Sequence, residues 1–488
     1  MDEHVPVLIV GGGMVGLSAA VFAASQGIDC QLVERRSTTS SQPRSRGLNP
    51  RTMELMRSVG LEEAIRQAPS ARALLDNSGM IAMESLAGRE VGALQDNWVT
   101  DVHTDLSALT PTSWCLCHQA DLEPLLLERA GKLGADLRFG HELIHVEQDD
   151  DGVTATIRAA DRQRTVRADY LIAADGPHSS VRTALGIDWD SSEVHGNYLN
   201  IHFRADLREA LGDRRFVMAY TFRPFRSGLM PLDNALEWLL HVVFEPAETF
   251  DEARCVELVR AVAGIPELDV ELLGAAPWQA VGRTATSFRQ GRIFLAGDSA
   301  HTMPPSGAFG ANTGLQDAYN LVWKLGSVLR GEAGPSLLDT YDAERRPVAE
   351  ATVRQAILRS NDRPRMTGQN PAPPNPEIVP DTEIWFGDRA PHLPLSRSGT
   401  EISTLDLFGS GYVLLAGPDG EKWLAAAKTV TAYRIGAPGL IDISGRWQEA
   451  YEVGASGAVL VRPDGVIAWR ATTLPPDPEL ALTTALAH

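Results

Sequence analysis

The stretch from Val5 to Glu34 constrains the fold more than any other part of the sequence. It begins with a continuous apolar run, Val5–Val10, as expected for a strand that is buried on both faces. A glycine-rich turn follows, then small and apolar residues at helical spacing, and then a second apolar run, Cys30–Glu34. This order predicts a βαβ unit, and therefore an α/β domain built on a parallel sheet.

The turn of this unit has the spacing Gly11-x-Gly13-x-x-Gly16, which is typical of dinucleotide binding. Gly11 permits the tight turn, Gly13 lets a pyrophosphate approach the backbone, and Gly16 lets the helix pack closely against the strand. The phosphates would lie at the helix N-terminus, where free N–H groups favour anions. Glu34 ends the second strand, where its carboxylate can accept hydrogen bonds from ribose hydroxyls. This favours FAD or NAD over NADP, because a 2′-phosphate would meet a negative charge.

Three arginines follow this unit at positions that suit a nucleotide. Arg35 comes directly after Glu34 and can pack on the adenine or the ribose. Arg44 and Arg46 lie in a loop bounded by proline and glycine, where two guanidinium groups can bind a pyrophosphate or the phosphates of a second nucleotide. The alternative for all three is a solvated charge on a loop.

Two further glycine-centred segments lie far along the chain. Asp175-Gly176 follows a buried strand, and Gly297-Asp298 follows another. A carboxylate at Asp298 can accept a hydrogen bond from a ribityl or ribose hydroxyl. The segment Pro304–Asn312 has little side-chain bulk and is expected to form a loop whose N–H groups stabilise negative charge on a polar ring edge. A reduced flavin develops such charge at N1 and C2=O, so this segment favours a flavin, although a purely structural turn is the alternative.

Two residue groups suggest other chemistry, but the sequence lacks the rest of it. Cys115 and Cys117, beside His118, resemble metal ligands, yet no second cluster completes a site, so we expect no metal. Ser299, with His301 close by, suggests a hydrolase. No Gly-x-Ser-x-Gly elbow accompanies it, so we expect Ser299 to belong to the glycine turn.

The composition excludes several classes of protein. A formal net charge of −19 argues against nucleic acid and anionic membrane surfaces as partners. No apolar stretch reaches the roughly 20 residues of a membrane helix, and the acidic N-terminus does not resemble a signal peptide. Four cysteines in 488 residues indicate no disulfide framework. We therefore expect a cytoplasmic protein.

The nucleotide domain is predicted to be discontinuous. A helix is expected from Gln119 to Leu133, a β-meander from Glu142 to Ala174, and another buried strand at Arg292–Ala296. A strong helix is expected at Leu315–Leu329. The domain is predicted to comprise residues 1–75, 113–188 and 281–360.

A second sheet is expected to be inserted into this domain, formed by residues 76–112 and 189–280. The larger segment alternates in the manner of strands and is rich in aromatic residues, which suggests a sheet that lies over a site. Each aromatic residue is nevertheless more often part of a core than a ligand contact. The candidates for the substrate pocket are Tyr220, Phe222, Phe225 and Trp238.

The C-terminal part of the chain is expected to form a separate domain. Residues 361–394 are assigned to a linker, because Asn361–Pro380 is rich in proline and asparagine with little apolar content. Residues 395–488 contain strands of their own. They include a hairpin with Pro463-Asp464-Gly465 at its turn.

The three glycine-centred segments resemble the fingerprints of FAD-dependent aromatic monooxygenases of the para-hydroxybenzoate hydroxylase type. Asn49–Glu54 and Asn312–Leu325 resemble the branch that hydroxylates aromatic polyketides, and so do Ser403–Gly409 and Gly457–Arg470. The resemblance implies an α/β fold with a Rossmann-like FAD-binding domain, an inserted mixed or antiparallel sheet for substrate, and a thioredoxin-like C-terminal domain. Redox cysteines would be missing from that domain, since no cysteine follows Cys255.

The resemblance also implies the cofactors and their contacts. FAD would be bound non-covalently, and NADPH or NADH would visit without a domain of its own, helped by Arg44 or Arg46. Gln119 would lie near the ribityl chain, and Phe309 departs from the family's loop pattern and can shape the pocket. The residues expected to contact cofactor are Gly11, Gly13, Val15, Gly16, Glu34, Arg35, Arg44, Arg46, Gln119, Asp175, Asp298, Pro305, Gly307, Gly310, Ala311 and Asn312.

The implied reaction is hydroxylation of a polycyclic aromatic polyketide or similar phenol in secondary-metabolite biosynthesis. NAD(P)H would reduce FAD, and O2 would add at the C4a carbon to give a hydroperoxyflavin that oxidises the ring. The alternatives are a Baeyer–Villiger or epoxidising enzyme, a hydroxylase of phenols or xenobiotics that inactivates antibiotics, and a catalytically silent flavin-binding protein in an assembly. No catalytic base is identified, and a monomer or homodimer is expected.

Overall fold

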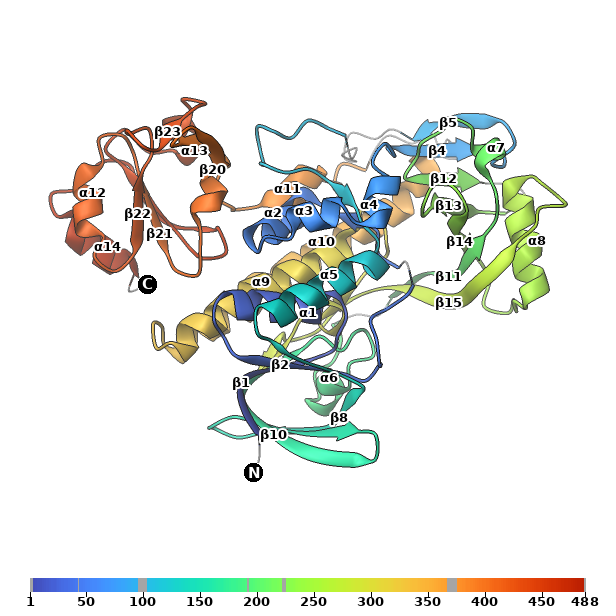
Figure 1. Cartoon of the computed structure of the whole chain (residues 1–488), viewed down its shortest axis with the longest axis horizontal. Coiled ribbons are helices and arrows are strands. Elements are labelled where there is room, and N and C mark those ends of the chain that lie inside the picture. The colour runs from blue at the N-terminus through green and yellow to red at the C-terminus, as the bar shows by residue number, and fades with distance from the viewer. Residues whose placement is uncertain are drawn as a thin grey trace.

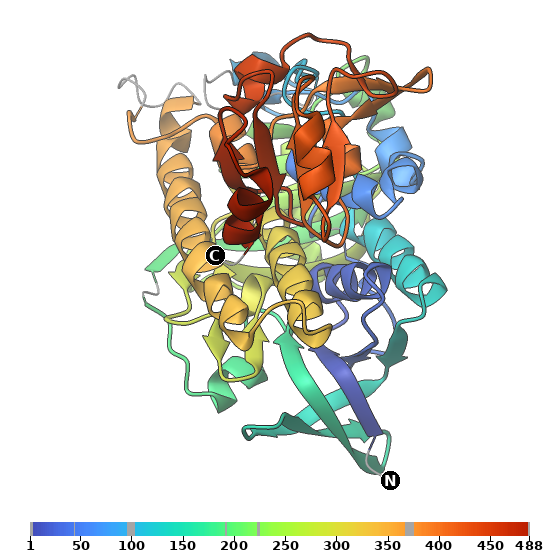
Figure 2. The same ribbon diagram turned by 90° about the vertical axis from the view of Figure 1, so that its left-hand side faces the viewer.

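The computed structural model describes residues 3–42, 44–94, 103–190, 193–221, 225–366 and 375–486. Three parts follow one another along the molecule, as Figure 1 shows. An α/β part lies in the middle, a second sheet lies at one end, and the C-terminal residues form a separate body at the other end. Figure 2 looks onto this C-terminal body, with long helices of the middle part behind it.

The middle part is built on a sheet with the strand order β16-β17-β10-β1-β2-β7. Neighbouring strands from β17 to β7 are parallel, as predicted for a βαβ-based domain. β10 also continues into a meander with β9 and β8. The strands are β1 (Glu3–Val10), β2 (Cys30–Glu34), β7 (Asp136–Phe139), β8 (His141–Gln148), β9 (Val153–Ala159), β10 (Arg162–Ala173), β16 (Arg289–Gln290) and β17 (Ile293–Leu295).

Helix α1 (Met14–Ser25) lies at the centre of this part. It contacts both α5 (Gln119–Lys132) and α9 (Phe309–Leu329), and it is buried from Gly16 to Ala23. A helix that is enclosed in this way is apolar on every side, which explains its small and apolar residues. The other elements of this part are β3 (Gly47–Leu48), α2 (Pro50–Ser58), α3 (Glu62–Arg66), α4 (Pro69–Ala73), β6 (Cys115–Leu116), α6 (Ser180–Ala184), η1 (Gly297–Ser299), η2 (Pro335–Leu338) and α10 (Asp339–Met366).

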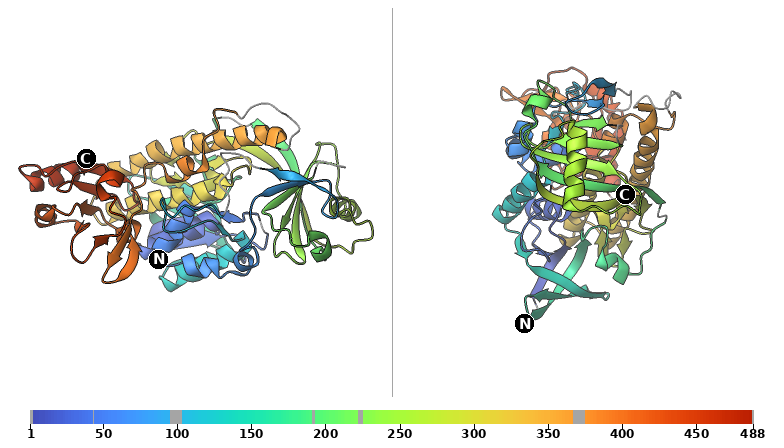
Figure 3. Two further views of the ribbon diagram at one scale, coloured as in Figure 1. Left: turned by 90° about the horizontal axis from the view of Figure 1, so that it is seen from above. Right: turned by 90° about the vertical axis from the view of Figure 1, so that its right-hand side faces the viewer.

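The second sheet has eight strands in the order β18-β15-β11-β14-β13-β12-β4-β5. All neighbouring pairs are antiparallel except β4 with β12. Helix α8 (Glu252–Ala263) covers the face that turns away from the middle part (Figure 3). The other elements are β4 (Met80–Met83), β5 (Glu90–Leu94), β11 (Glu193–Arg204), α7 (Arg208–Leu211), β12 (Met218–Thr221), β13 (Ser227–Pro231), β14 (Glu237–Val243), β15 (Glu271–Thr284) and β18 (His301–Thr302).

The C-terminal body contains a four-stranded sheet with the order β22-β21-β24-β25. β21 is parallel to β22, whereas β24 is antiparallel to both β21 and β25. A three-stranded sheet, β20-β19-β23, lies beside it. α11 (Asp381–Phe386) precedes this body and lies beside α2 of the middle part (Figure 1). The elements of the body are β19 (Pro394–Arg397), β20 (Thr400–Ser403), η3 (Thr404–Leu407), β21 (Val413–Ala416), α12 (Glu421–Ala426), β22 (Thr431–Arg434), β23 (Ile441–Asp442), α13 (Trp447–Tyr451), β24 (Ala458–Val461), β25 (Ile467–Ala471) and α14 (Pro478–Leu486).

Several boundaries differ from the sequence-based expectations. α9 begins at Phe309, so Gly310 to Asn312 form its first turn rather than a loop. α10 continues to Met366, into the segment assigned to a linker, and α11 also lies in that segment. α8 lies within the segment predicted to contain strands, and its buried residues Cys255, Leu258, Val259 and Val262 follow helical spacing instead. The hairpin around residues 463–465 is confirmed.

Candidate flavin and substrate site

The three glycine-centred segments meet at one edge of the parallel sheet. β1, β10 and β17 are adjacent strands that end at Val10, Ala173 and Leu295, each directly before a glycine-centred segment. The N–H of Ala174 donates to Val10 O (2.8 Å), and the N–H of Ala296 donates to Ala173 O (3.0 Å). Ligands of open parallel sheets bind outside the carboxyl ends of the strands, so this edge is the candidate cofactor site.

The first glycine turn leaves no room for side chains where it packs. Gly11 has φ +110°, and a Cβ atom there would lie 2.2 Å from Ala174 O. A Cβ atom at Gly16 would lie 1.9 Å from Gly11 O. At Gly13, in contrast, the nearest atom to such a Cβ would be 3.7 Å away, so the backbone there is open to a ligand. α1 has no side-chain cap, which leaves its first N–H groups available for a pyrophosphate.

The carboxylate of Glu34 faces this turn from the end of β2. It accepts a hydrogen bond from the N–H of Gly12 (2.6 Å) and two from Arg36, at its N–H (2.8 Å) and at Nε (3.0 Å). Burial raises the pKa of Glu34, but the hydrogen bonds from Arg36 and Gly12 outweigh burial and lower it below its usual value. Glu34 is therefore an ionised acceptor beside the glycine turn, while Arg35 is exposed.

Gln119 lies at the start of α5, close to the same turn. Its Nε2 donates to Glu123 Oε1 (2.7 Å), and the N–H of Ser40 donates to Glu123 Oε2 (2.7 Å). Glu123 is fully buried and is the group nearest to the open side of Gly13. Glu123 was not among the predicted site residues, although its spacing from Gln119, one helical turn earlier, is a signal for such a contact.

Arg44 and Arg46 have different surroundings. Arg44 is exposed, and its Nε donates to Gln42 Oε1 (2.9 Å). Arg46 donates to the carbonyls of Pro231 (3.0 Å) and Val217 (2.8 Å), which belong to the second sheet. Burial lowers the pKa of Arg46 to about 10. Arg46 thus joins the two domains, and two of its donors are already used.

Asp175 and Asp298 follow adjacent strands and lie near two arginines. Asp175 Oδ2 accepts from the N–H of Val181 (3.2 Å), whereas its Oδ1 is buried and has no partner among the described residues. Asp298 is exposed at the sheet edge. Desolvation by neighbouring protein atoms raises the pKa of Asp298, and its interactions with His301, Arg44 and Arg283 oppose the rise.

Ser299 belongs to the turn, as predicted. Its hydroxyl donates to Ala173 O (2.7 Å) and Ala296 O (2.8 Å), and it is fully buried. Behind it, the buried carboxylate of Asp317 accepts from the N–H of Gly297 (3.2 Å) and pairs with His301 Nε2 (2.7 Å).

Arg345 of α10 completes this buried cluster through a bond from its Nε to Asp317 Oδ1 (2.8 Å). Burial raises the pKa of Asp317, but Arg345 and His301 together lower it below the usual range. The cluster fixes the third glycine turn to α9 and α10. Asp317 lies in a segment quoted for the family resemblance, but its buried role could not be inferred from spacing alone.

The N-terminus of α9 approaches the edge from the other side. Its N-cap residue, Ala308, has a left-handed conformation (φ +53°) and a side chain that cannot accept a hydrogen bond. The first N–H groups of α9 therefore have no side-chain cap. Asn312 is buried: its Oδ1 accepts from the N–H of Asn49 (3.0 Å), and its Nδ2 donates to Gly47 O (3.0 Å). Pro305, Gly307, Gly310 and Ala311 are more accessible.

Val15 connects the first and third segments. A Cβ atom at Gly297 would lie 2.7 Å from Val15 Cγ2, and one at Gly314 would lie 2.8 Å from the same atom. α1, η1 and α9 are therefore packed as closely as glycine permits. The expected cofactor residues lie around one sheet edge. This edge offers two helix N-termini without side-chain caps, an open backbone at Gly13, and the carboxylates of Asp175 and Asp298. Such an arrangement fits a dinucleotide such as FAD.

The face of the second sheet opposite α8 turns toward this edge (Figures 1 and 3). Along β14, Trp238, Leu240 and Val242 pack beneath α8, so Leu239 and His241 point to the opposite face. Their cross-strand neighbours share that face. They include Met80, Ala82, Met218, Tyr220, Gly228, Met230, Asn200 and His202.

The structure changes the list of pocket candidates. Trp238 is fully buried beneath α8, where the alternation of β14 places it, and Phe225, just before β13, packs against the same cluster. Both predictions were therefore wrong. Phe309 is 2% exposed beneath the cofactor loop, with Arg359 4.6 Å from its ring centre. Tyr220 lies on the face toward the cofactor edge. Phe222 lies outside the described residues.

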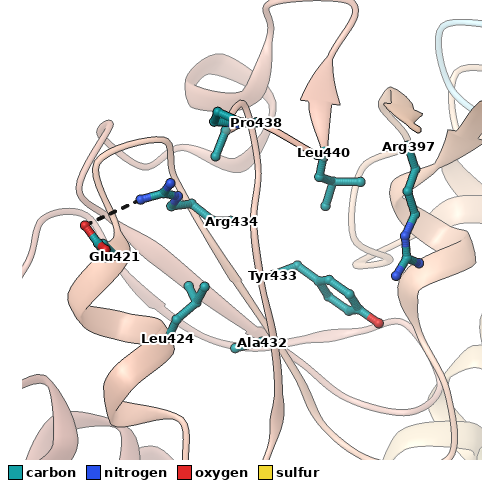
Figure 4. A pocket seen from close by; sticks show the side chains of 10 residues that line it. Arg397, Glu421, Leu424, Ala432, Tyr433, Arg434, Pro438 and Leu440 are labelled. Carbon is teal, nitrogen blue, oxygen red and sulfur yellow. Dashed lines mark ion pairs between the residues drawn. The ribbon is translucent and has the colours of Figure 1, made fainter. Parts of the chain in front are cut away.

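A separate hollow of about 400 Å³ lies in the C-terminal body (Figure 4). Arg397, Glu421, Tyr433 and Arg434 line it, and Glu421 pairs with Arg434 at 3.7 Å. It is distant from all three glycine turns, so the chemistry is not assigned to it. Within the described ranges, no group of three or more metal-ligating side chains is found, and none of the helices is both long and apolar enough to cross a membrane.

Comparison with known proteins identifies the family. The model of the FAD binding domain family matches residues 4–356, and that of the aromatic-ring hydroxylase C-terminal family matches residues 383–488. The chain therefore belongs to the FAD-dependent aromatic-ring hydroxylases. It is a flavoprotein monooxygenase, as the resemblance of its glycine segments implied.

Three relatives illustrate this membership. A Streptomyces halstedii protein named as a polyketide hydroxylase is 43% identical, with 96% of this chain and 93% of that protein covered. The 4-methyl-5-nitrocatechol 5-monooxygenase of a Burkholderia species is 40% identical, with 99% and 96% covered. The crystal structure of an aklavinone-11 hydroxylase with FAD and aklavinone is similar over 100% of this chain and 99% of that one, with a TM-score of 0.90 and 35% identity.

Proposed function

We propose that this monooxygenase uses NAD(P)H and O2 to hydroxylate a polycyclic aromatic polyketide in the biosynthesis of a secondary metabolite. The observation that supports this most is the full-length similarity to polyketide hydroxylases, together with a sheet that presents a broad apolar face to the cofactor edge. Methionines at positions 80, 218 and 230 contribute to that face. Methionine side chains adapt to large, irregular ligands, which suits a multi-ring substrate.

FAD, when bound, would supply the oxygen-activating chemistry. In the proposed arrangement, the N–H groups at Gly13 to Gly16 bind its pyrophosphate, Glu34 and Arg35 bind its adenosine half, and Asp298 binds its ribityl chain. The first turn of α9, from Phe309 to Asn312, offers N–H groups to the polar edge of the flavin. The remaining expected contacts, including Gln119 and Asp175, lie at the same sheet edge.

Arg44 is the better of the two loop arginines for a transient NAD(P)H, because Arg46 already donates to two carbonyls. Arg44 is exposed, which suits a co-substrate that binds and dissociates in each catalytic cycle. The positive charge near Asp298 further favours a phosphate-bearing ligand there.

The test is direct. The purified protein should be yellow, and candidate polyketide phenols should accelerate NAD(P)H oxidation and gain one labelled oxygen atom under ¹⁸O₂. Asp298→Ala should lower FAD occupancy, with Asp339→Ala, an exposed aspartate on α10, as the matched control. A colourless protein that takes up no FAD would contradict the proposal. Labelled oxygen in an ester or an epoxide would indicate the Baeyer–Villiger or epoxidising alternative.

A second candidate is hydroxylation of a simple phenol, such as a nitrocatechol or another xenobiotic. The 40% identity to the nitrocatechol monooxygenase favours it. Side-by-side kcat/KM values for a one-ring catechol and a four-ring polyketide distinguish the two functions.

We also propose the domain assignment and surroundings of the enzyme. Residues 1–75, 113–188 and 285–360 form the FAD-binding domain, and residues 76–112 and 189–284 form the substrate domain, because β15 continues past the expected boundary at residue 280 to Thr284. The C-terminal body is thioredoxin-like, which its strand order and helix placement support. The protein works in the cytoplasm as a monomer or homodimer, and size-exclusion chromatography with light scattering measures the latter.

A further inference from the structure

The C-terminal body contacts the FAD-binding domain through the turn of its β24–β25 hairpin. The hydroxyl of Tyr319 lies 3.4 Å from Pro463 O, and Asn320 Nδ2 donates to Asp464 Oδ2 (3.0 Å). Tyr319 and Asn320 both belong to α9. The carboxylate of Asp464 is almost completely buried, with 4% of the residue exposed. The turn is therefore embedded against α9 and is not a surface loop.

The same turn also holds α2. Arg51, in the first turn of α2, donates from Nη2 to Asp464 O (2.7 Å) and from Nη1 to Glu54 Oε2 (2.9 Å). Asp464 thus bonds α9 with its side chain and α2 with its backbone. A single residue of the C-terminal body touches both helices.

Several charged side chains are buried or partly buried at this contact between the C-terminal body and the FAD-binding domain. Arg462 forms two hydrogen bonds of 2.8 Å to Glu344 of α10 and also pairs with Asp464. Lys324, fully buried in α9, lies 3.0 Å from Glu344, and burial lowers its pKa to about 8. Breaking a buried ion pair leaves an uncompensated charge, so these groups favour one relative placement of the domains.

α2 and α9 also meet at their N-termini, at the proposed flavin site. Asn49 caps α2 by accepting from the N–H of Thr52 (2.8 Å), and its own N–H donates to Asn312 in the first turn of α9. Asn320 follows Asn312 by about 12 Å along the helix at 1.5 Å per residue. The two helices are therefore held together twice, once beside the flavin site and once through Asp464.

We propose that Asp464 is a positioning residue for the flavin: it fixes α9 relative to α2, and thereby the backbone groups at residues 47–49 and 305–312 that would enclose the flavin ring. This inference rests on the proposed FAD site at the N-terminus of α9. It gives the C-terminal body, which has no cysteine and no assigned chemistry, a role in the monooxygenase reaction.

The experiment compares FAD binding in full-length variants. Asp464→Asn should weaken FAD binding by about 10-fold, which falls within the usual range for remote coupling. It should also shift the flavin absorption maxima, while circular dichroism of the apoprotein stays native. Lys428→Ala, which removes an exposed ion pair with Glu479 elsewhere in the same body, is the control and should leave both readouts unchanged.

Rescue separates positioning from general destabilisation. The conservative variant Asp464→Glu keeps a carboxylate for Asn320 and Arg462, so it should retain more of the FAD affinity than Asp464→Asn does. If Asp464→Asn does not fold, Asn320→Ala removes the hydrogen bonds from α9 to Asp464 and to Glu344 without changing any charge, and it should weaken FAD binding several-fold. Unchanged FAD affinity and flavin spectrum in a folded variant would overturn the inference, whereas a wild-type protein that binds no FAD would overturn the proposed function itself.

Discussion

The cofactor edge and the substrate sheet lie side by side but are built on different principles. At the edge, the ligand is expected to meet backbone N–H groups, and glycines at fixed spacing make room for it. A Cβ atom at Gly11 or Gly16 would lie about 2 Å from a carbonyl oxygen. On the sheet, the ligand is expected to meet side chains. Successive residues of one strand point alternately toward the cofactor edge and into the core beneath α8, so only this alternation distinguishes pocket residues from core residues.

This difference explains which features could be recognised in the sequence. A backbone site depends on turns that few residues tolerate, so its glycines are fixed by geometry. A side-chain pocket tolerates many residues, and an aromatic residue fits either face of a strand. The predictions below test the contrast, from the largest expected effect to the smallest.

The largest effect is expected at the cofactor edge. Gly11→Val should abolish FAD binding and lower the stability by more than about 2 kcal/mol, because φ +110° is strained for a β-branched residue and the Cβ atom would meet Ala174 O at 2.2 Å. FAD fluorescence titration and chemical unfolding measure the two effects. Gly27→Val is the control: its φ of +71° is also positive, but no atom lies within 4 Å of its Cβ position. Equal FAD loss in both variants would contradict the steric argument.

A somewhat smaller effect is expected behind the edge, where the side chains are buried and charged. Asp317→Asn should destabilise the protein by about 3 kcal/mol, because Arg345 and His301 lose a buried carboxylate. Since the cluster also bonds the N–H of Gly297, FAD affinity should fall as well. Urea unfolding of the apoprotein measures the first effect, with exposed Asp339→Asn as the control. A destabilisation below 1 kcal/mol would mean that the cluster is not needed to hold the turn.

Asp317 also illustrates the limit of sequence reasoning. The βαβ unit and the C-terminal hairpin could be predicted because each depends on local spacing, whereas a common site for the three glycine segments was predicted from the family resemblance. The partners of Asp317 could not be predicted, because His301 and Arg345 reach it from other elements. The start of α9 was missed for a similar reason: Ala308 caps it in a left-handed conformation that no sequence signal marks.

The junction between the two regions should respond to pH. Burial and the charge of Arg46 lower the pKa of His118 to about 3, so this residue stays neutral in the folded protein. The unfolded chain takes up a proton near pH 6.5, and stability from this residue is therefore lost as the pH falls from above 6.5 toward 3. Between pH 7 and 5 the loss should be about 2 kcal/mol.

His118→Gln should remove that part of the acid sensitivity. Unfolding free energies measured at pH 7 and pH 5 give the difference, and the variant His178→Gln, at an exposed histidine, is the control. If His118→Gln keeps the full pH dependence, the histidine is not held neutral at the junction.

The smallest effect on activity is expected within the substrate sheet, where it separates the two faces. Tyr220→Phe should change KM for the aromatic substrate a few-fold, because it removes a hydroxyl from the face toward the cofactor edge and keeps the ring in place. Trp238→Phe should lower the stability by about 1–2 kcal/mol, because it leaves a void beneath α8 and an unbonded Ala205 carbonyl. Its KM should stay at the wild-type value. Steady-state kinetics and thermal unfolding of both variants show which face of the sheet lines the substrate pocket. A changed KM in Trp238→Phe alone would mean that the pocket lies on the face covered by α8.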